Sequence, residues 1–468
     1  MRTISICILN LLLFISVHAQ DTVKYFSFPE FIQTVRTYHP VAKQADLIVQ
    51  EAKAELLSAR GNFDPLLTSS YGQKTFDGTN YYQHWNPEIR IPTWYGIELR
   101  GGLEEIYGDR TNNSLTLGQT SYAGISVPLA RNLIMDQRRA ILKQAKIFRS
   151  QSEEEKKILL NDLIFDASVA YWNWVAAYQY FNTVKNLVQI NEERFRFIKN
   201  SFLQGDRPAI DTTEALTQLQ NFISIQIDAT LDLQNRNLEL SNFLWLQNDS
   251  TYTLPQDVIP SGTLDDLQNI NIAASSVDQL VSEAMRNHPI LRSYDYKLQG
   301  LEVNRSYKFQ GLLPYVNVKA NLLNKGYNVT KGIDAAMLQN NHIVGLDVAI
   351  PLRFSQGRGD YRKAKIKIED TRYEINFKSK EIENKIRAYY NEMNALSEQV
   401  RVNEAAYRNF ATLVRGEETR FRLGESSLFL LNTRENKLLE VQQKIIELKS
   451  KYLKTVSALQ WSAGILYR

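Results

Sequence analysis

The chain has 468 residues, of which 44% are hydrophobic and 23% are charged, and its formal net charge at pH 7 is +4. This composition is too apolar for a disordered chain, and the nearly balanced charge gives no argument for nucleic acid as a partner. The five histidines are scattered without the spacing of metal ligands, so the composition points to no metal or other cofactor.

Residues 1–19 have the pattern of a secretory signal peptide. Arg2 supplies the positive charge, residues 4–17 the apolar stretch, and Val17-His18-Ala19 a small-residue cleavage site. The only cysteine, Cys7, lies in this leader, so we expect no disulfide, thiol chemistry or lipid-modified cysteine in the mature chain. No later stretch approaches the length of a transmembrane helix, so entry into a membrane would require strands closed into a barrel.

Residues 20–255 form the first of two similar segments. Apolar side chains at helical spacing predict a helix over 26–61, and alternating Tyr-, Thr-, Ser- and Gly-rich residues predict strands over 66–127. The segment 129–254 contains no Gly or Pro except in the Gly-Asp-Arg-Pro cluster at 205–208. Because such a cluster forces the chain to turn, we expect a long helical hairpin over 129–254 with its tip at 205–208.

After a polar connector at 256–275, the same order of elements is predicted over 276–468. The expected elements are a helix over 277–311, strands over 315–350, and a helical hairpin over 360–463 with its tip at 424–427. In the last run, apolar residues from Leu438 to Leu459 step by three and four, as in coiled coils. Such helices cannot bury their apolar stripes alone, so they need each other or other subunits.

Paired anchors in the two segments indicate an internal duplication. His39-Pro40 matches His288-Pro289, Pro128-Leu129 matches Pro351-Leu352, and the run ending at Gly205 matches the run ending at Gly424. Because each His-Pro pair recurs with the duplication, we interpret both as structural turns and not as metal ligands.

The predicted strands suit a membrane barrel. Val316, Val318, Ala320 and Leu322 alternate with polar residues, so one face would contact lipid and the other a wet lumen. Alternation alone also fits a soluble sheet with one wet face, but the leader and the long helices favour the membrane. We expect two strands per repeat, too few to close a barrel within one chain. The first strand region, 66–127, is longer than the second and could hold a surface loop or an added hairpin.

In the combination and order of these features the chain resembles the TolC-type outer-membrane efflux proteins. The resemblance rests on the duplication, on the strand exit from Gly124 to Pro128, and on the turn signatures around Gly205 with Ile210-Asp211 and around Gly424 with the leucines of 428–431. It implies a mainly α-helical fold of duplicated antiparallel hairpins forming a coiled-coil α-barrel. The strands would contribute to a shared twelve-stranded barrel of a homotrimer.

The resemblance also implies a place and partners. The strands would contact outer-membrane lipid, and the helical part would cross the periplasm. There it would dock onto a periplasmic adaptor (membrane fusion) protein and, through the adaptor, serve an inner-membrane pump.

The resemblance places a closable periplasmic gate and the adaptor contact at the helix turns. The candidate residues are Gly205, Asp206, Arg207, Asp211, Glu214, Arg420, Arg422, Gly424 and Glu425. Charges near a constriction could latch neighbouring hairpins through ion pairs, or they could be solvated charges at exposed helix ends. If they form a latch, Asp211→Ala or Arg420→Ala should raise the conductance of the isolated channel.

A duct needs no catalytic group, and no Ser/His/Asp set, phosphate loop or paired acids emerges, so we expect no enzyme. Tyr171, Trp172 and Trp174 are interpreted as packing at helical spacing. The alternative is an exported periplasmic coiled-coil scaffold or adhesin without transport activity, which would not explain the strands. Whether the cargo is a small molecule, a metal ion or a polypeptide stays open.

Overall fold

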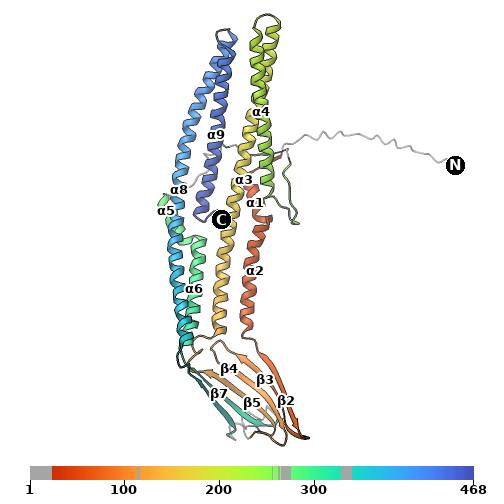
Figure 1. The fold of residues 1–468 in the computed structure, drawn as a ribbon, viewed down its shortest axis with the longest axis vertical. Coiled ribbons are helices and arrows are strands. Elements are labelled where there is room, and N and C mark those ends of the chain that lie inside the picture. The colour runs from red at the N-terminus through yellow and green to blue at the C-terminus, as the bar shows by residue number, and fades with distance from the viewer. Residues whose placement is uncertain (1–23, 113–115, 256, 262–263, 265–275, 328–339) are drawn as a thin grey trace, which may run out of the picture. The chain divides into compact units, whose positions relative to one another are not determined.

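The computed structural model describes residues 24–112, 116–255, 257–261, 264, 276–327 and 340–468 (Figure 1). The predicted signal peptide and most of the predicted connector lie outside these residues. The chain divides into two compact units. The first, which we call the turn unit, holds the described residues of 1–38, 167–270 and 398–453; the second, the strand unit, holds those of 39–166, 271–397 and 454–468.

The helix expected at 26–61 is broken. It consists of α1 (Phe28–Tyr38) and α2 (Pro40–Gly61), because Pro40 has no N–H with which to continue α1. His39 caps α2: its Nδ1 accepts a hydrogen bond from the Val41 N–H at 3.2 Å.

The second half repeats this break. The helix expected at 277–311 consists of α5 (Val277–Asn287), α6 (Pro289–Phe309) and a 3-10 turn, η2 (Gln310–Leu312). His288 lies between α5 and α6, and its Nδ1 accepts a hydrogen bond from the Ile290 N–H at 3.2 Å. The interpretation of both His-Pro pairs as structural turns is confirmed.

The described residues contain two long helical hairpins, each made of two helices. The first is α3 (Gln137–Leu203) with α4 (Ala209–Ser241), and the second is α8 (Ser355–Arg422) with α9 (Leu428–Ser462). None of the described helices is both long enough and apolar enough to cross a membrane. In the turn unit, short strands β1 (Lys24–Phe26) and β6 (Val258–Pro260) pair in parallel.

The first hairpin starts later and ends earlier than the expected 129–254. The Leu129 N–H donates to the Val316 carbonyl oxygen at 2.8 Å, so the chain there is still bonded to a strand and is not helical. α3 begins after Asp136, whose Oδ1 accepts a hydrogen bond from the Arg139 N–H at 2.8 Å. α4 ends at Ser241, and the chain after it reverses at Asp249, which has a φ of +62°.

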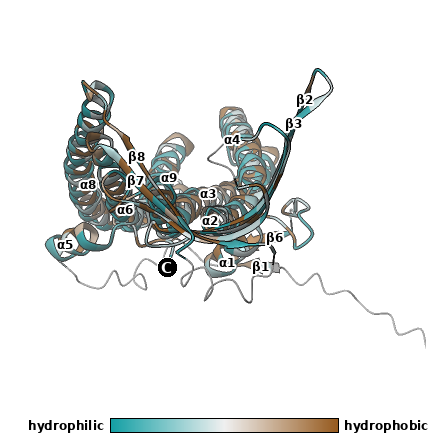
Figure 2. Cartoon of the chain, turned by 90° about the horizontal axis from the view of Figure 1, so that it is seen from below, coloured by the Kyte–Doolittle hydropathy of each residue, from teal (hydrophilic) through white to brown (hydrophobic). Residues whose placement is uncertain are grey.

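Six strands form one antiparallel sheet among the described residues of the strand unit. They are β2 (Leu66–Phe76), β3 (Thr79–Pro92), β4 (Glu98–Tyr107), β5 (Gly118–Pro128), β7 (Tyr315–Lys325) and β8 (His342–Ala349). Their spatial order is β2-β3-β4-β5-β7-β8, and the sheet is curved, with β2 and β8 at its edges (Figure 2).

The expectation of two strands per repeat is therefore wrong for the first repeat, where the extra length is an added hairpin. β2 and β3 are joined by Asp77 and Gly78, both with positive φ, as a tight two-residue hairpin turn requires.

The sheet has two chemically different faces. Pairing joins Leu67 to Ile89, Ile91 to Leu99, and Leu99 to Ile125 across the first half. The same face continues through the second half, where its paired side chains are Val127, Val318, Leu346, Val316 and Val348. Several of these apolar side chains are exposed in the single chain, including Leu67, Leu346 and Val348.

The opposite face of the sheet is polar and holds paired charges. Its ion pairs are Arg90 with Glu88 at 2.9 Å, Arg100 with Glu98 at 2.7 Å, and Lys319 with Asp347 at 2.9 Å. The Tyr122 hydroxyl also donates to Glu88 Oε2 at 2.8 Å. The alternation predicted for 316–322 thus recurs in the neighbouring strands of the sheet, but it is weak in β2, where Ser69 and Gln73 lie on the same face as Leu67.

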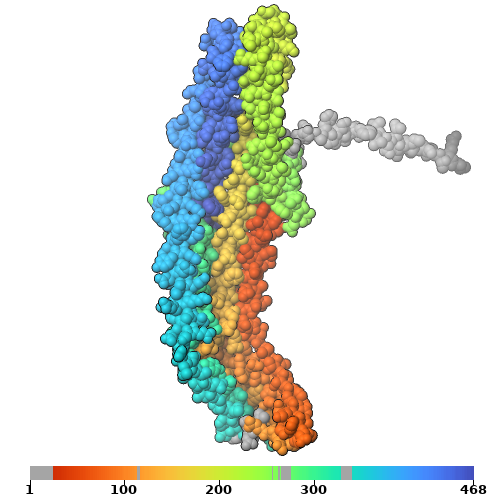
Figure 3. All heavy atoms as spheres, in the orientation of Figure 1, coloured from red at the N-terminus to blue at the C-terminus, as the bar shows by residue number. Residues whose placement is uncertain are grey.

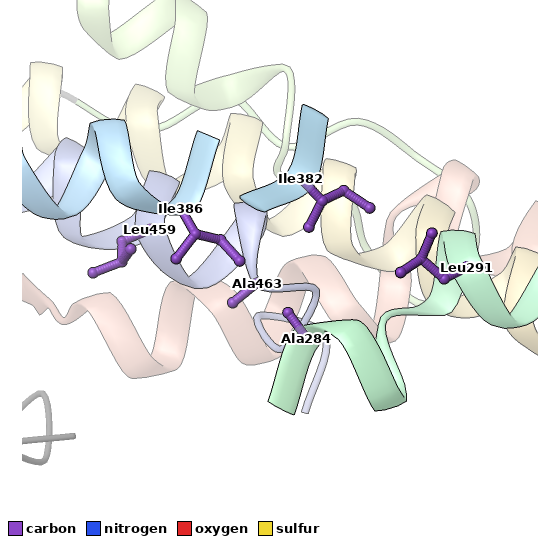
Figure 4. Close-up of a cluster of buried hydrophobic side chains, with 6 residues drawn as sticks. All are labelled: Ala284, Leu291, Ile382, Ile386, Leu459 and Ala463. Carbon is purple, nitrogen blue, oxygen red and sulfur yellow. The ribbon is translucent and has the colours of Figure 1, made fainter. Parts of the chain in front are cut away.

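Small apolar clusters hold the helices together. In the strand unit, one cluster joins α5, α6, α8 and the end of α9 through Ala284, Leu291, Ile382, Ile386, Leu459 and Ala463 (Figure 4). In the turn unit, Tyr171 and Trp174 are fully buried, and the Trp172 ring stacks on Phe28 with centroids 4.9 Å apart. The interpretation of these aromatic residues as packing is confirmed.

Candidate functional site at the helical turns

Each long hairpin reverses at a glycine in the left-handed backbone region. The φ of Gly205 is +82° and that of Gly424 is +78°. The Gly205 N–H donates to the Phe202 carbonyl at 2.9 Å, and the next N–H, of Asp206, donates to the Ser201 carbonyl at 2.9 Å. This pair of bonds is a Schellman motif, in which N–H groups after the helix donate to carbonyl groups in the last turn of α3.

The second turn has the same backbone. The Gly424 N–H donates to the Phe421 carbonyl at 3.1 Å, and the Glu425 N–H donates to the Arg420 carbonyl at 2.8 Å. A Cβ at either glycine would meet no atom within 4 Å, so glycine is needed for its backbone conformation and not for space.

An apolar core joins the two turns within the turn unit. It contains Ile198 of α3, Ala215 of α4, Phe421 of α8, and Leu428 and Leu431 of α9. Phe421 and Leu431 are almost fully buried, so all four helix ends share one small core. The ends of the two hairpins lie side by side (Figures 1 and 3).

Arg207 connects the first turn to the second. Its Nη1 lies 3.3 Å from Asp211 Oδ2, in the first turn of α4. Its Nη2 donates to the Phe421 carbonyl oxygen at 3.1 Å, and the guanidinium lies 4.0 Å from the centre of the Phe421 ring. The Phe421 carbonyl also accepts the Gly424 N–H, so Arg207 adds a second hydrogen bond to the end of α8 from the other hairpin. We call this set of contacts the Arg207 tie.

A buried ion pair lies between α3 and α9, further along the helices from the turns. Arg194 of α3 forms a two-pronged pair with Glu435 of α9, at 2.7 Å and 2.5 Å. Asn191 Nδ2 also donates to Glu435 Oε2, at 3.4 Å. Both charged side chains are nearly buried, at 11% and 5% exposed, so each is the compensating partner of the other and removing one would leave a buried charge unpaired.

Amide side chains join α4 to α9 beside this pair. Gln218 Nε2 donates to Asn436 Oδ1 at 2.8 Å, and Asn432 Nδ2 donates to Glu214 Oε1 at 3.3 Å. Burial raises the pKa of Glu214, and the Asn432 hydrogen bond opposes that rise.

Within the second hairpin, Glu417 links α8 to α9. It accepts hydrogen bonds from the Ser426 hydroxyl and from Arg434 Nε, the latter at 2.7 Å. These two donors lower the pKa of Glu417, the Ser426 hydroxyl more than Arg434.

The other predicted site residues have local contacts. Arg422 pairs with Glu418 one helical turn away at 2.8 Å, and Arg420 Nη2 donates to the Glu425 carbonyl at 3.4 Å. Asp206 and Glu425 contribute backbone amides to the turns described above. The structure therefore brings Arg207, Asp211 and Glu214 to the junction of the hairpins, whereas Arg420 and Arg422 stay with α8 and its own turn.

Sequence reasoning missed Arg194 and Glu435. A signal was present, because Glu435 interrupts the apolar stripe of α9 between Leu431 and Leu439, at the four-residue spacing of one helix face. Its partner could not be found that way, since Arg194 lies in the other half of the chain.

No protein-family model matches the chain, and no curated protein matches it by sequence. Solved structures do match. A structure of CusC, described as concerning transmembrane channel formation, has a TM-score of 0.67 at 13% identity, covering 93% of this chain and 91% of CusC. The Campylobacter jejuni CmeC outer membrane channel has a TM-score of 0.63 at 14% identity, covering 93% and 85%.

The open state of the Neisseria gonorrhoeae MtrE outer membrane channel has a TM-score of 0.65 at 12% identity, covering 93% of this chain and 88% of MtrE. At this level of identity the likeness establishes the fold. The predicted fold class, mainly α-helical with duplicated long hairpins and a strand portion, is confirmed.

Proposed function

We propose that this chain, which has the fold of the TolC-type outer-membrane channels, is a passive exit duct in the outer membrane. The observation that carries the proposal is the two-faced sheet: an exposed apolar face backed by a face of paired charges. In lipid, a charge near the bilayer midplane costs about 2–4 kcal/mol, so only the apolar face suits the membrane. The polar face would then line a water-filled lumen.

The edges of the sheet support assembly of several copies. In one chain β2 and β8 each leave a row of unpaired backbone groups. Because the number of described strands is even and all neighbours are antiparallel, β8 of one copy can pair antiparallel with β2 of the next. A homotrimer would supply three times six, or eighteen, strands in place of the twelve that the resemblance implied.

The finer assignments belong to the same proposal. After export through a cleaved leader at 1–19, the helical part would lie in the periplasm. The turns of the turn unit would meet a periplasmic adaptor protein and, through it, an inner-membrane pump. The Arg207 tie and the residues around Gly205 and Gly424 would hold this end closed. The duct itself would conduct without catalysis, and the pump would select the cargo.

Reconstitution of the purified protein in planar bilayers tests the proposal. We expect single-channel conductance, and we expect the protein in the outer-membrane fraction with heat-modifiable mobility on a gel. Release as a soluble periplasmic protein without conductance would contradict the duct and favour the scaffold.

A further inference from the structure

A polar hollow of about 330 Å³ lies in the strand unit where the sheet meets the helices. It is lined by the chain just after β5, by the end of α6 with η2, and by the link from β8 into α8. The charged groups in its lining are Arg131, Lys308, Arg353 and Asp360. Three cations thus face one carboxylate, so the hollow carries a net positive charge.

Two of these cations are available to a ligand. Lys308 Nζ pairs with Asp360 Oδ2 at 3.4 Å. Among the described residues, no acceptor lies within hydrogen-bond distance of the Arg131 or Arg353 guanidinium. A guanidinium presents a planar fork of donors that matches the oxygens of a phosphate or a carboxylate.

A buried amide offers a further donor. Gln310 is 3% exposed, and its Oε1 accepts a hydrogen bond from the Asn132 N–H at 3.2 Å. Gln310 is one of the residues that line the hollow, so its Nε2 is the group of this amide left to act as a donor there. The first amides of α8, which starts at Ser355, add donors of the same kind.

The hollow lies at the rim of the apolar face of the sheet. The Arg131 N–H donates to the Pro314 carbonyl oxygen at 3.1 Å, so residues 129–131 continue the pairing of β5 with β7. Because side chains alternate along a strand, Val127, Leu129 and Arg131 lie on the same, apolar face. Arg131 is therefore the charged residue at the end of this apolar row. Beside Arg353, Leu352 is 98% exposed. In a membrane-inserted chain, such a leucine could enter the lipid while the neighbouring arginine reaches the headgroups.

We propose that this hollow binds the phosphate of a glycerophospholipid headgroup. Arg131 and Arg353 would grip the phosphate oxygens, and the Gln310 amide would donate to one of them. The lipid would come from the inner face of the outer membrane, so its source rests on the proposed function. Free phosphate has the same chemistry, but the position at the apolar rim favours the lipid.

Calorimetric titration of the full-length protein in detergent tests this assignment. The probes are dihexanoyl phosphatidylglycerol, inorganic phosphate, and dihexanoylglycerol, which lacks the phosphate. We expect the phospholipid to bind at least ten times more tightly than either of the others. Arg131→Gln with Arg353→Gln should weaken phospholipid binding at least tenfold. The matched control, Arg196→Gln with Arg401→Gln, removes two exposed arginines of the turn unit and should bind as the wild type does.

Each other outcome overturns the proposal. If the double glutamine variant bound the phospholipid as tightly as the wild type, the two arginines would not be the phosphate ligands. Equal affinity for inorganic phosphate would show an anion site without a lipid, and equal affinity for dihexanoylglycerol would show an apolar surface without phosphate recognition. Should the glutamine variant fail to fold, Arg131→Lys with Arg353→Lys keeps the charge but loses the fork, and binding should still weaken severalfold.

Conductance of the same preparations separates this inference from the proposed function. If the protein conducts normally but does not bind the phospholipid selectively, the lipid site is wrong and the proposed duct stands. Arginine-dependent phospholipid binding without conductance or outer-membrane fractionation defeats the duct alone.

Discussion

The first half of the chain reverses at Gly205 and the second at Gly424, with φ of +82° and +78° and the same pair of backbone hydrogen bonds. Their side chains differ. Two residues after Gly205 stands Arg207, which reaches the other hairpin, whereas two residues after Gly424 stands Ser426, which bonds Glu417 in its own hairpin. Duplication has kept what the backbone geometry demands and has left the charged contacts free to diverge. The contacts that join the two hairpins at their turns therefore come unequally from the two halves.

The strand regions teach the same lesson. To the six-stranded sheet the first half contributes four strands and the second contributes two, yet one face is apolar in both. An added hairpin brings two strands at once, so it preserves the antiparallel relation of the sheet edges. The alternation recurs in both halves, while the number of strands differs between them by one hairpin.

The largest asymmetry between the halves is the buried pair of Arg194 and Glu435. Glu435 lies eleven residues after Gly424 (435 − 424), and the equivalent position eleven after Gly205 (216 − 205) is Leu216, which is exposed. Glu435→Ala leaves Arg194 buried without its partner and should destabilise the protein by about 3–5 kcal/mol. Thermal unfolding measures this, and Leu216→Ala should cost far less. A similar loss for both variants would contradict the asymmetry.

The two His-Pro turns differ in burial, and this predicts a pH effect. Burial of His288 lowers its pKa to about 4 from an ordinary value of 6.5. The folded protein thus keeps His288 neutral while the unfolded chain takes up a proton below pH 6.5, so stability falls as the pH drops from 6.5 to 4. The full loss is about 3 kcal/mol.

His288→Asn keeps a capping acceptor and removes this titration. Urea unfolding at pH 7 and pH 4.5 should show a smaller pH dependence for the variant than for the wild type. The same substitution at His39 leaves the titration of His288 in place and serves as the control. Equal pH dependence in all three proteins would exclude His288 as the cause.

Removing the Arg207 tie should change stability and channel conductance more than removing a charge of the second turn. Arg207→Ala removes the bonds to Asp211 and to the Phe421 carbonyl, and should destabilise the turn unit by about 2 kcal/mol and raise channel conductance. Asp211→Ala should act in the same direction but less, because the Phe421 contacts of Arg207 remain. Arg420→Ala should change conductance least, since Arg420 is exposed and contacts only its own turn among the described residues. A larger effect of Arg420→Ala in planar bilayers would reverse this ranking.

The smallest expected effect on stability comes from substituting the turn glycines, which the two halves have in common. Gly205→Ala and Gly424→Ala each force a side chain into the left-handed region without a clash, so each should cost about 1 kcal/mol. Asparagine at the same positions should cost less, because it tolerates this conformation better. Melting temperatures of the four variants test the equivalence, and a clear difference between the two glycines would show that the turns are not alike.

Several features could be predicted from the sequence because their signals are local. The turn at Gly205-Asp206-Arg207-Pro208, the breaks at both His-Pro pairs and the alternation from Val316 to Leu322 all depend on neighbouring residues. Of the residues that form contacts at or near the helical turns, the turn glycines, Arg207 and Asp211 were named from the sequence, but Arg194 and Glu435 were not. Helix ends were less accurate, because residues 129–131 lack Gly and Pro and yet bond to β7.

By itself, the sequence determined the duplication, the positions of the turns and the two-faced character of the strands, since periodicity and turn residues act over a few positions. Tertiary structure alone decided which groups meet across the chain. Arg194 finds Glu435 from 241 positions away, Arg207 finds Phe421 from 214, and Arg131, Gln310 and Arg353 gather around one hollow. The physical reason is that a charge reveals its role only through the burial and the partner that folding gives it.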